Sequence, residues 1–265
     1  MMNQFTTFFK KEWLEMWRSL KFVWVPLVFI ILGIMDAIMN YFMDDIVASV
    51  GNLPEGFEII LPDFTPVDIY TATTGEFQSI GLVVLVAIFA SFISRERQTG
   101  TATLLYVRPI SFVSYFLSKW AMAVALAVGC VVLGYFSSFY YTNLLFGSVP
   151  FDKFLAMVGT YCVWIIFAVS FTLAMSAAFK TSIAMAISIL VIPIFIMIDS
   201  LIESLVGSFW TMTPWKLANY GVQILSGNVV WKDYYWTLAI TVSLTIVFIA
   251  LGIFMSKKNA ATTKI

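Results

Sequence analysis

Six long runs of apolar residues divide the chain, and each is long enough to cross a membrane. A helix of about 18 or more apolar residues spans the ~30 Å hydrocarbon core of a bilayer. Because backbone polar groups find no water in lipid, each run must satisfy them within a helix. The pattern therefore predicts an all-α membrane protein with six transmembrane helices, at residues 22–43, 77–94, 120–141, 154–179, 182–198 and 234–255.

The charges between these runs are unevenly distributed, and they predict the orientation of the chain. If the N-terminus is cytoplasmic, the inner segments are residues 1–21, 95–119, 180–181 and 256–265. They then hold 12 of the 15 basic residues but only three of the 15 acidic ones. Basic residues concentrate on cytoplasmic loops, so both termini are predicted inside, and residues 1–265 are predicted to form one transmembrane domain. The inner basic residues are Lys10, Lys11, Arg18, Lys21, Arg95, Arg97, Arg108, Lys119, Lys180, Lys257, Lys258 and Lys264.

Residues 4–21 precede the first run and have the pattern of an amphipathic helix. Such a helix lies in the membrane interface with its lysines toward the headgroups. The alternative is the ordinary basic flank of a first transmembrane helix. On a helical wheel one face carries Phe5, Phe8, Phe9, Trp13, Met16 and Leu20, and the other carries Lys10, Lys11, Glu15, Arg18 and Lys21.

Two outer segments have unusual compositions. Residues 44–75 form a loop with six acidic residues and no Lys or Arg; it either binds a cation or basic substrate or is simply solvated. Residues 199–233 are too apolar for a plain loop, yet neither half is long enough to span. They are predicted as two short re-entrant or interfacial helices dipping into the outer leaflet, with Asp199 and Glu203 at the outer surface.

Composition agrees with a membrane protein and narrows its chemistry. Hydrophobic residues make up 61% of the chain, and the mean hydropathy is +0.93. The absence of histidine excludes Ser-His and Cys-His nucleophile pairs and an HExxH zinc site. Cys130 and Cys162 lie in apolar runs and are expected as small buried residues. Without a GxxxxGK(S/T) motif, the chain is not expected to be an enzyme or to bind ATP, a metal or another cofactor itself.

Residues 95–119 are predicted to fold as a helix, a short helix and another helix, separated by breaks. Gly100 can take the left-handed conformation that ends the first helix, and Thr101 can cap the second. Pro109 ends the second helix, and Ser111 can cap the third. The short helix presents Leu104, Leu105 and Tyr106 as an apolar knob, with Arg108 at its end, and an exposed apolar surface favours a partner.

The stretch ERQTGTATLLYVRPIS, with a later Ser-Lys, resembles the first cytoplasmic loop of ABC-2 type ABC transporter permease subunits. The residues that carry the resemblance are Glu96, Gly100, Thr101, Leu104, Leu105, Pro109 and Lys119. The overall plan is similar over nearly the full chain. Among these proteins the chain looks closest to compact permeases of bacterial exporters.

The resemblance implies a multi-pass permease of a cell membrane, which pairs with a second permease subunit and two ABC ATP-binding subunits. ATP and magnesium would bind to the partner, and the substrate path would lie between the two permeases. The short helix would be a coupling helix docking on the ATP-binding subunit, with Lys180-Thr181 as a minor contact. The residues expected to couple are Arg95, Glu96, Arg97, Gly100, Thr101, Leu104, Leu105, Tyr106, Arg108 and Pro109; the arginines alone could equally serve only topology.

Asp36 is the one acid expected well inside a predicted transmembrane helix, and Asn40 lies one turn later. A charged side chain at mid-membrane is costly, so the pair either lines a substrate path or forms interhelical hydrogen bonds. A self-sufficient secondary transporter or channel using Asp36 is the alternative function, although no internal repeat supports it. The sequence does not identify the substrate.

Overall fold

The computed structural model describes residues 2–43, 46, 64–100, 110–206 and 212–262, and this part of the chain is helical without a strand. Predictions for residues 101–109 and for most of the outer loop therefore lie outside the described residues. The helices are α1 (Met2–Arg18), α2 (Lys21–Tyr41), α4 (Pro66–Glu76), the π-helix η1 (Phe77–Gly81), α5 (Leu82–Phe89), α6 (Ser94–Gln98), α8 (Phe112–Leu145), α9 (Phe151–Ala178), α10 (Thr181–Val206), α11 (Lys216–Ser226) and α12 (Trp231–Thr262).

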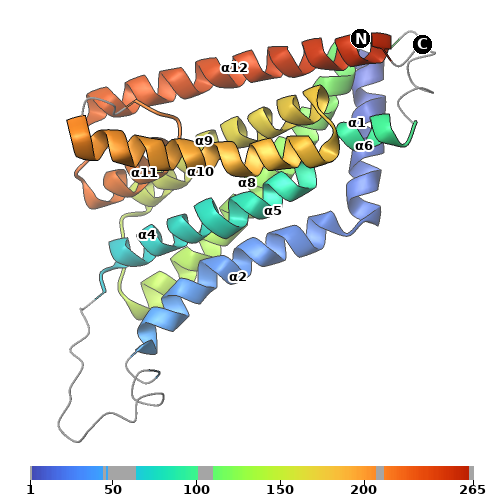
Figure 1. The fold of residues 1–265 in the computed structure, drawn as a ribbon. Helices are drawn as coiled ribbons and strands as arrows, with labels where there is room; N and C mark the ends of the chain where they lie inside the picture. The colour runs from blue at the N-terminus through green and yellow to red at the C-terminus, as the bar shows by residue number, and fades with distance from the viewer. Residues whose placement is uncertain (1, 44–45, 47–63, 101–109, 207–211, 263–265) are drawn as a thin grey trace, which may run out of the picture.

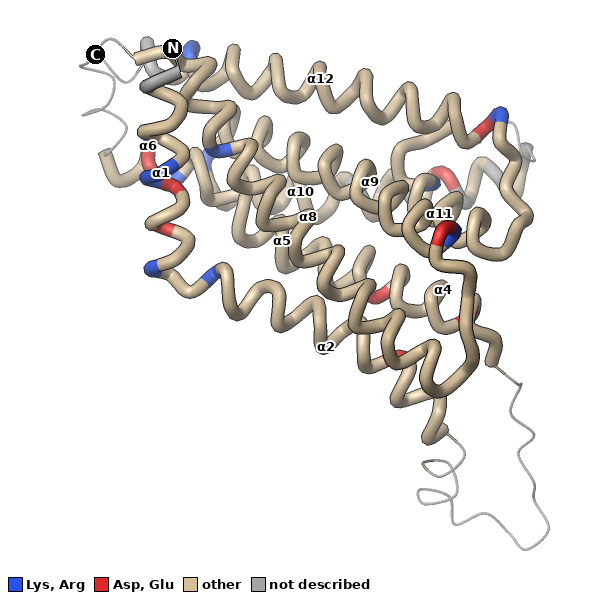
Figure 2. Tube along the Cα trace, turned by 180° about the vertical axis from the view of Figure 1, so that it is seen from behind, with Lys and Arg blue, Asp and Glu red and all other residues tan. Residues whose placement is uncertain are grey.

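Within the described residues, six helices are long and apolar enough to cross a membrane, which confirms the predicted all-α fold with six such helices. These helices lie side by side, and α1 crosses the bundle at one end (Figure 1). Both ends of the chain and α6 lie at this same end, called the α1 end below. Lysines, arginines and acids gather largely toward the two ends of the bundle, and the middle is mostly uncharged (Figure 2). The orientation of the α1 end toward the cytoplasm remains a prediction.

The second membrane-spanning element begins earlier than the sequence pattern predicted. A continuous helical stretch runs from Pro66 to Gln98, so residues 66–75 are not part of an outer loop. The start is fixed by a capping box, in which the Thr65 hydroxyl accepts from the Asp68 amide and the Asp68 carboxylate accepts from the Thr65 amide. Glu76 lies in this same helical stretch, so a second acid belongs to a helix that is long enough to span, and the expectation that Asp36 is the one acid well inside a span stays a prediction.

Close packing in the bundle depends on small residues where α2 meets α8. A Cβ atom at Gly33 would clash with the carbonyl oxygen of Gly134, so the two backbones lie in direct contact. Phe77, the first residue of η1, packs against Phe29 of α2 and Tyr135 of α8 with ring centroids 5.1 and 4.8 Å apart. These contacts fix α2, η1 and α8 relative to one another.

The segment between the fifth and sixth spans differs from its prediction. Helix α10 continues to Val206, and α11 is a separate amphipathic helix that ends at Gly227 in the left-handed conformation (φ 83°). Asp199 is buried, not at the surface, because its carboxylate accepts from the Trp215 indole at 3.0 Å and lies 3.5 Å from the Lys216 ammonium. These contacts tie α10 to the start of α11; a position in the outer leaflet remains a prediction.

Candidate functional site

The α1 end contains a cluster of charged side chains that joins three helices far apart in the sequence. Lys119 of α8 lies 2.8 Å from a Glu12 oxygen of α1 and 3.1 Å from a Glu96 oxygen of α6. Lys119 and Glu12 are each only 1% exposed. Because a buried ion pair left without one partner is strongly unfavourable, Lys119 requires both α1 and α6 to stay in place.

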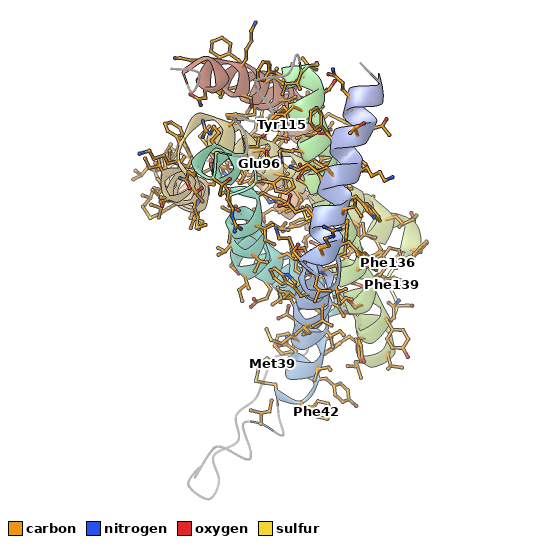
Figure 3. All side chains as sticks on the ribbon, turned by 90° about the vertical axis from the view of Figure 1, so that its right-hand side faces the viewer. Met39, Phe42, Glu96, Tyr115, Phe136 and Phe139 are labelled. Atoms are coloured by element: carbon orange, nitrogen blue, oxygen red, sulfur yellow. The ribbon has the colours of Figure 1, made fainter. Side chains whose placement is uncertain are left out.

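Glu96 is the centre of this charge cluster. Its first carboxylate oxygen contacts the ammonium groups of Lys11 and Lys119, and its second accepts a hydrogen bond from the Tyr115 hydroxyl at 2.6 Å. Figure 3 shows Glu96 and Tyr115 at the α1 end, viewed along the bundle. Glu96, which the sequence predicts to take part in coupling to the ATP-binding subunit, is thus held by Lys11 of α1. Tyr115 and Lys119 hold it from two successive turns of α8.

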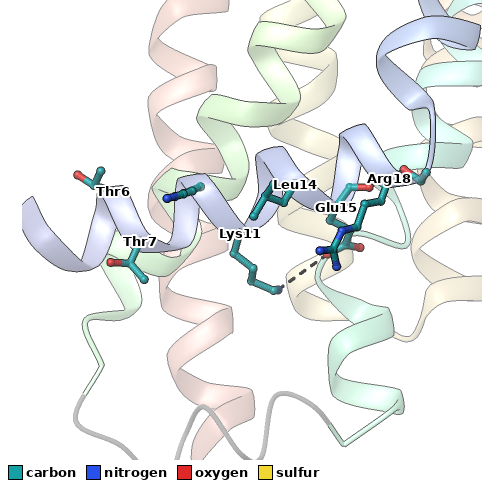
Figure 4. Close-up of a pocket in the computed structure, with 8 residues that line it drawn as sticks. Thr6, Thr7, Lys11, Leu14, Glu15 and Arg18 are labelled. Carbon is teal, nitrogen blue, oxygen red and sulfur yellow. Dashed lines mark hydrogen bonds and ion pairs between the residues drawn. The ribbon is translucent and has the colours of Figure 1, made fainter.

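Lys11 contributes a second positive charge. Burial alone lowers the pKa of a lysine, but the neighbouring Glu12 and Glu96 carboxylates outweigh it and hold the pKa of Lys11 above its ordinary value. Lys11 therefore stays charged at neutral pH and balances Glu96 together with Lys119. A groove of about 930 Å³ runs along α1 beside Lys11, lined also by Leu14 and Arg18 (Figure 4).

The faces of α1 differ in part from the helical-wheel prediction. Phe8, Phe9 and Met16 pack against the bundle as expected. Trp13 and Leu20, however, are 46% and 63% exposed. Glu12 is buried on the packed face beside Met16, where it pairs with Lys119. The exposed tryptophan suits a helix lying at a membrane interface.

Arg97 anchors α6 to the end of α9. Its guanidinium donates to the carbonyl oxygens of Ala177 (2.8 Å), Ser176 (3.0 Å) and Phe179. These carbonyls belong to the last turn of α9, which lacks helical partners and carries partial negative charge. Arg97 therefore makes a structural contact between α6 and α9, in addition to the effect of its charge on the orientation of the chain.

The hydroxyl groups beside Arg97 extend the same contact to α10. Ser94 and Thr181 lie 2.7 Å apart between their hydroxyl oxygens, and the Ser176 hydroxyl accepts from the amides of Ile93 and Ser94 at 3.1 Å. The second inner connection, around Lys180-Thr181, thus lies directly beside α6.

The helix breaks predicted before and after the coupling helix are present at Gly100 and Ser111, which are described on either side of it. Gly100 adopts the left-handed conformation (φ 74°), and the Ser111 hydroxyl accepts from the Ser114 amide to begin α8. Arg95 is exposed. The remaining predicted coupling residues, Thr101, Leu104, Leu105, Tyr106, Arg108 and Pro109, lie outside the described residues.

A metal ion is not favoured in the charge cluster. Oxygens of Glu12, Glu15 and Glu96 lie within 4.8 Å of one another, which is a spacing that a cation could bridge. The ammonium groups of Lys11 and Lys119 already lie among them. The carboxylates are neutralised by lysines, so the geometry describes an ion-pair network.

Asp36 and Asn40 lie far from this cluster along α2. The Asn40 amide donates to the carbonyl of Asp36 in its own helix at 2.8 Å. Asn40 therefore bonds the backbone of Asp36, and a role of the pair in a substrate path or in an interhelical hydrogen bond stays a prediction.

Comparison with known proteins agrees with this architecture. The model of a family described as ABC-2 family transporter protein matches residues 6–214. A relative from Bacillus subtilis (strain 168), the uncharacterized transmembrane protein YxlG, is 32% identical over 172 residues, which cover 65% of this chain and 67% of the relative. The chain therefore belongs to the ABC-2 transporter family, whose members are the permease components of ABC exporters and are not themselves catalytic.

Proposed function

We propose that two permease subunits, this chain and a second copy or a related chain, enclose the substrate path, and that two ATP-binding subunits dock at the α1 end. The observation that supports docking there is the charge cluster centred on Glu96. It fixes both ends of the segment 101–109 to the bundle, since α6 precedes that segment and α8 follows it. An interface that must transmit force needs such fixed ends.

The helices leaving this end could carry a movement into the membrane. Helix α6 is the last part of the stretch Pro66–Gln98, and α8 runs for 34 residues from Phe112. A displacement of the segment 101–109 would therefore act on two membrane-spanning helices at once. Through Lys119 and Glu12 it would also act on α1, and through Arg97 on the end of α9.

In this proposal the chain performs no chemistry. The partner subunit would bind ATP and magnesium and hydrolyse the nucleotide, and this chain would convert the resulting closure into opening of the path. The apolar residues Leu104, Leu105 and Tyr106 would occupy a cleft on the partner, and Arg95, which is exposed on α6, would meet its acidic surface. A bacterial plasma membrane is the proposed location.

Replacing Leu104 and Leu105 together with aspartate is expected to abolish co-purification of the ATP-binding subunit, because two charges would enter an apolar cleft. The tagged full chain would be isolated in gentle detergent, and a P-loop ATPase sought by mass spectrometry. Val230→Asp is the matched control, since Val230 is exposed and lies at the opposite end.

Two outcomes would contradict the proposal. One is recovery of the wild-type permease without any ATPase while transport continues, which would favour a self-sufficient transporter. The other is unchanged ATPase association in the double aspartate variant, with membrane insertion intact.

A further inference from the structure

Helix α1 lies across the end of the bundle, and one of its sides is turned away from the other helices. It runs at a steep angle to the membrane-spanning helices (Figure 1), so its axis follows the membrane surface when those helices cross the bilayer. Glu12 and Met16 are buried against the bundle. Because each residue advances about 100° around an α-helix, Leu14 and Arg18 lie on the opposite side, and both are exposed.

This outward side of α1 forms the groove of about 930 Å³, called the basic groove below. Three basic side chains and one acid line it, together with hydroxyl groups. Figure 4 shows these side chains along one side of the helix. The described lining residues all belong to α1 and are Thr6, Thr7, Lys10, Lys11, Leu14, Glu15, Arg18 and Ser19. Its charge therefore suits an anionic ligand.

Two of the three cations in the basic groove are not engaged by acids of the protein. Lys11 contacts Glu96 in the charge cluster. Among the described residues, Lys10 and Arg18 form no ion pair, and both are exposed. Each lies four residues from Leu14, which is about 6 Å along the helix, and their long side chains can reach across that distance. The two cations can therefore meet over Leu14 around one anionic group.

Exposed tryptophans flank the basic groove along one edge. Trp13 lies three residues after Lys10, and Trp17 three residues after Leu14, so each occupies the neighbouring strip of the helix surface. Both indoles are exposed, and the exposed apolar surface continues into α2 at Trp24. Tryptophan favours the border between lipid headgroups and acyl chains. The tryptophans therefore place the basic groove in the headgroup layer, which favours a lipid over a protein as its ligand.

We propose that the basic groove binds the headgroup of an anionic phospholipid, with the phosphate held between Lys10 and Arg18 over Leu14. The arginine can pair with two phosphate oxygens at once, and the lysine adds a point charge. The acyl chains would enter the bilayer beside the tryptophans. A zwitterionic headgroup carries its own cation and would be held less well. The α1 end is predicted to face the cytoplasm, and the cytoplasmic leaflet carries anionic lipids.

Lys11 connects the basic groove to the charge cluster. It lines the groove and also contacts Glu96 of α6. A headgroup bound beside it would hold α1 at the membrane surface and, through Lys11, would help to hold α6. A ligand that binds only the folded protein stabilises it by mass action, so anionic lipid should raise the unfolding temperature. This lipid site does not rest on the proposed function.

The test compares how the purified full chain retains two lipids, dioleoyl phosphatidylglycerol and dioleoyl phosphatidylcholine, in native mass spectrometry. The wild type should retain the anionic lipid preferentially. In the Lys10→Gln/Arg18→Gln variant this preference should fall about tenfold, because both cations around the phosphate are removed. Phosphatidylglycerol should also raise the midpoint of thermal unfolding in detergent more for the wild type than for the variant. Without added lipid, the two midpoints should be equal, which shows that the variant folds.

The matched control is Lys257→Gln/Lys258→Gln, which removes two exposed lysines of α12 at the same end of the bundle. It should keep the lipid preference of the wild type. Equal retention of both lipids by the wild type, or an equal loss of preference in the control, would overturn the proposal. Lost association of the ATP-binding subunit in Lys10→Gln/Arg18→Gln, with lipid preference intact, would overturn it as well and would assign the groove to a protein partner.

Discussion

Replacing Lys119 with methionine is expected to destabilise the protein by at most about 3–5 kcal/mol, because the buried Glu12 carboxylate then keeps only the partly exposed Lys11 as a countercharge. Methionine keeps most of the volume of the lysine, so loss of packing contributes little. Lys119 also contacts Glu96, so α6 should loosen with α1. The measurement is the midpoint of thermal unfolding in detergent, with association of the ATP-binding subunit as a second readout.

The double variant Glu12→Gln/Lys119→Met separates charge from packing. Removing both charges should restore much of the lost stability, since neither partner remains buried and unpaired. Lys10→Met, at an exposed lysine on the same helix, should change little. If Lys119→Met were as stable as the wild type, or if the double variant were no better than the single one, the charge cluster would not hold α1 and α6 as described.

Replacing Gly33 with alanine is expected to cost about 1–3 kcal/mol or to separate α2 from α8, because the new methyl group would meet the Gly134 carbonyl. Gly129→Ala is the matched control, since a Cβ atom there meets nothing within 4 Å. Alanine favours helix over glycine, so the control should be neutral or slightly stabilising. Equal unfolding midpoints for both variants would refute the close α2–α8 contact.

The membrane-spanning helices could be predicted because apolar length is a local property of the chain. The apolar pattern missed the start of the second of these helices, because residues 66–76 contain threonines and two acids. These polar residues led to the prediction of a loop. The capping signal Thr65-Pro66-Val67-Asp68 marks the true start and was available in the sequence. It would have placed Glu76 within the helical stretch that begins at Pro66.

The candidate coupling site was predicted only in part, for a physical reason. Gly100 and Ser111 act on the backbone next to them, so their roles can be inferred from neighbouring residues. The partners of Glu96 are 85 residues away at Lys11 and 19 away at Tyr115, and such pairings depend on how helices pack. Glu12 offered one signal, since it falls on the same face of α1 as Met16.

The central claim is that the segment between α6 and α8 faces the cytoplasm, where a nucleotide-driven partner can reach it. A cysteine introduced by Tyr106→Cys tests this most directly with a membrane-impermeant maleimide, because both native cysteines, Cys130 and Cys162, lie within membrane-spanning helices. The account predicts no labelling in intact cells and strong labelling in inside-out vesicles. Labelling of that cysteine in intact cells would contradict it.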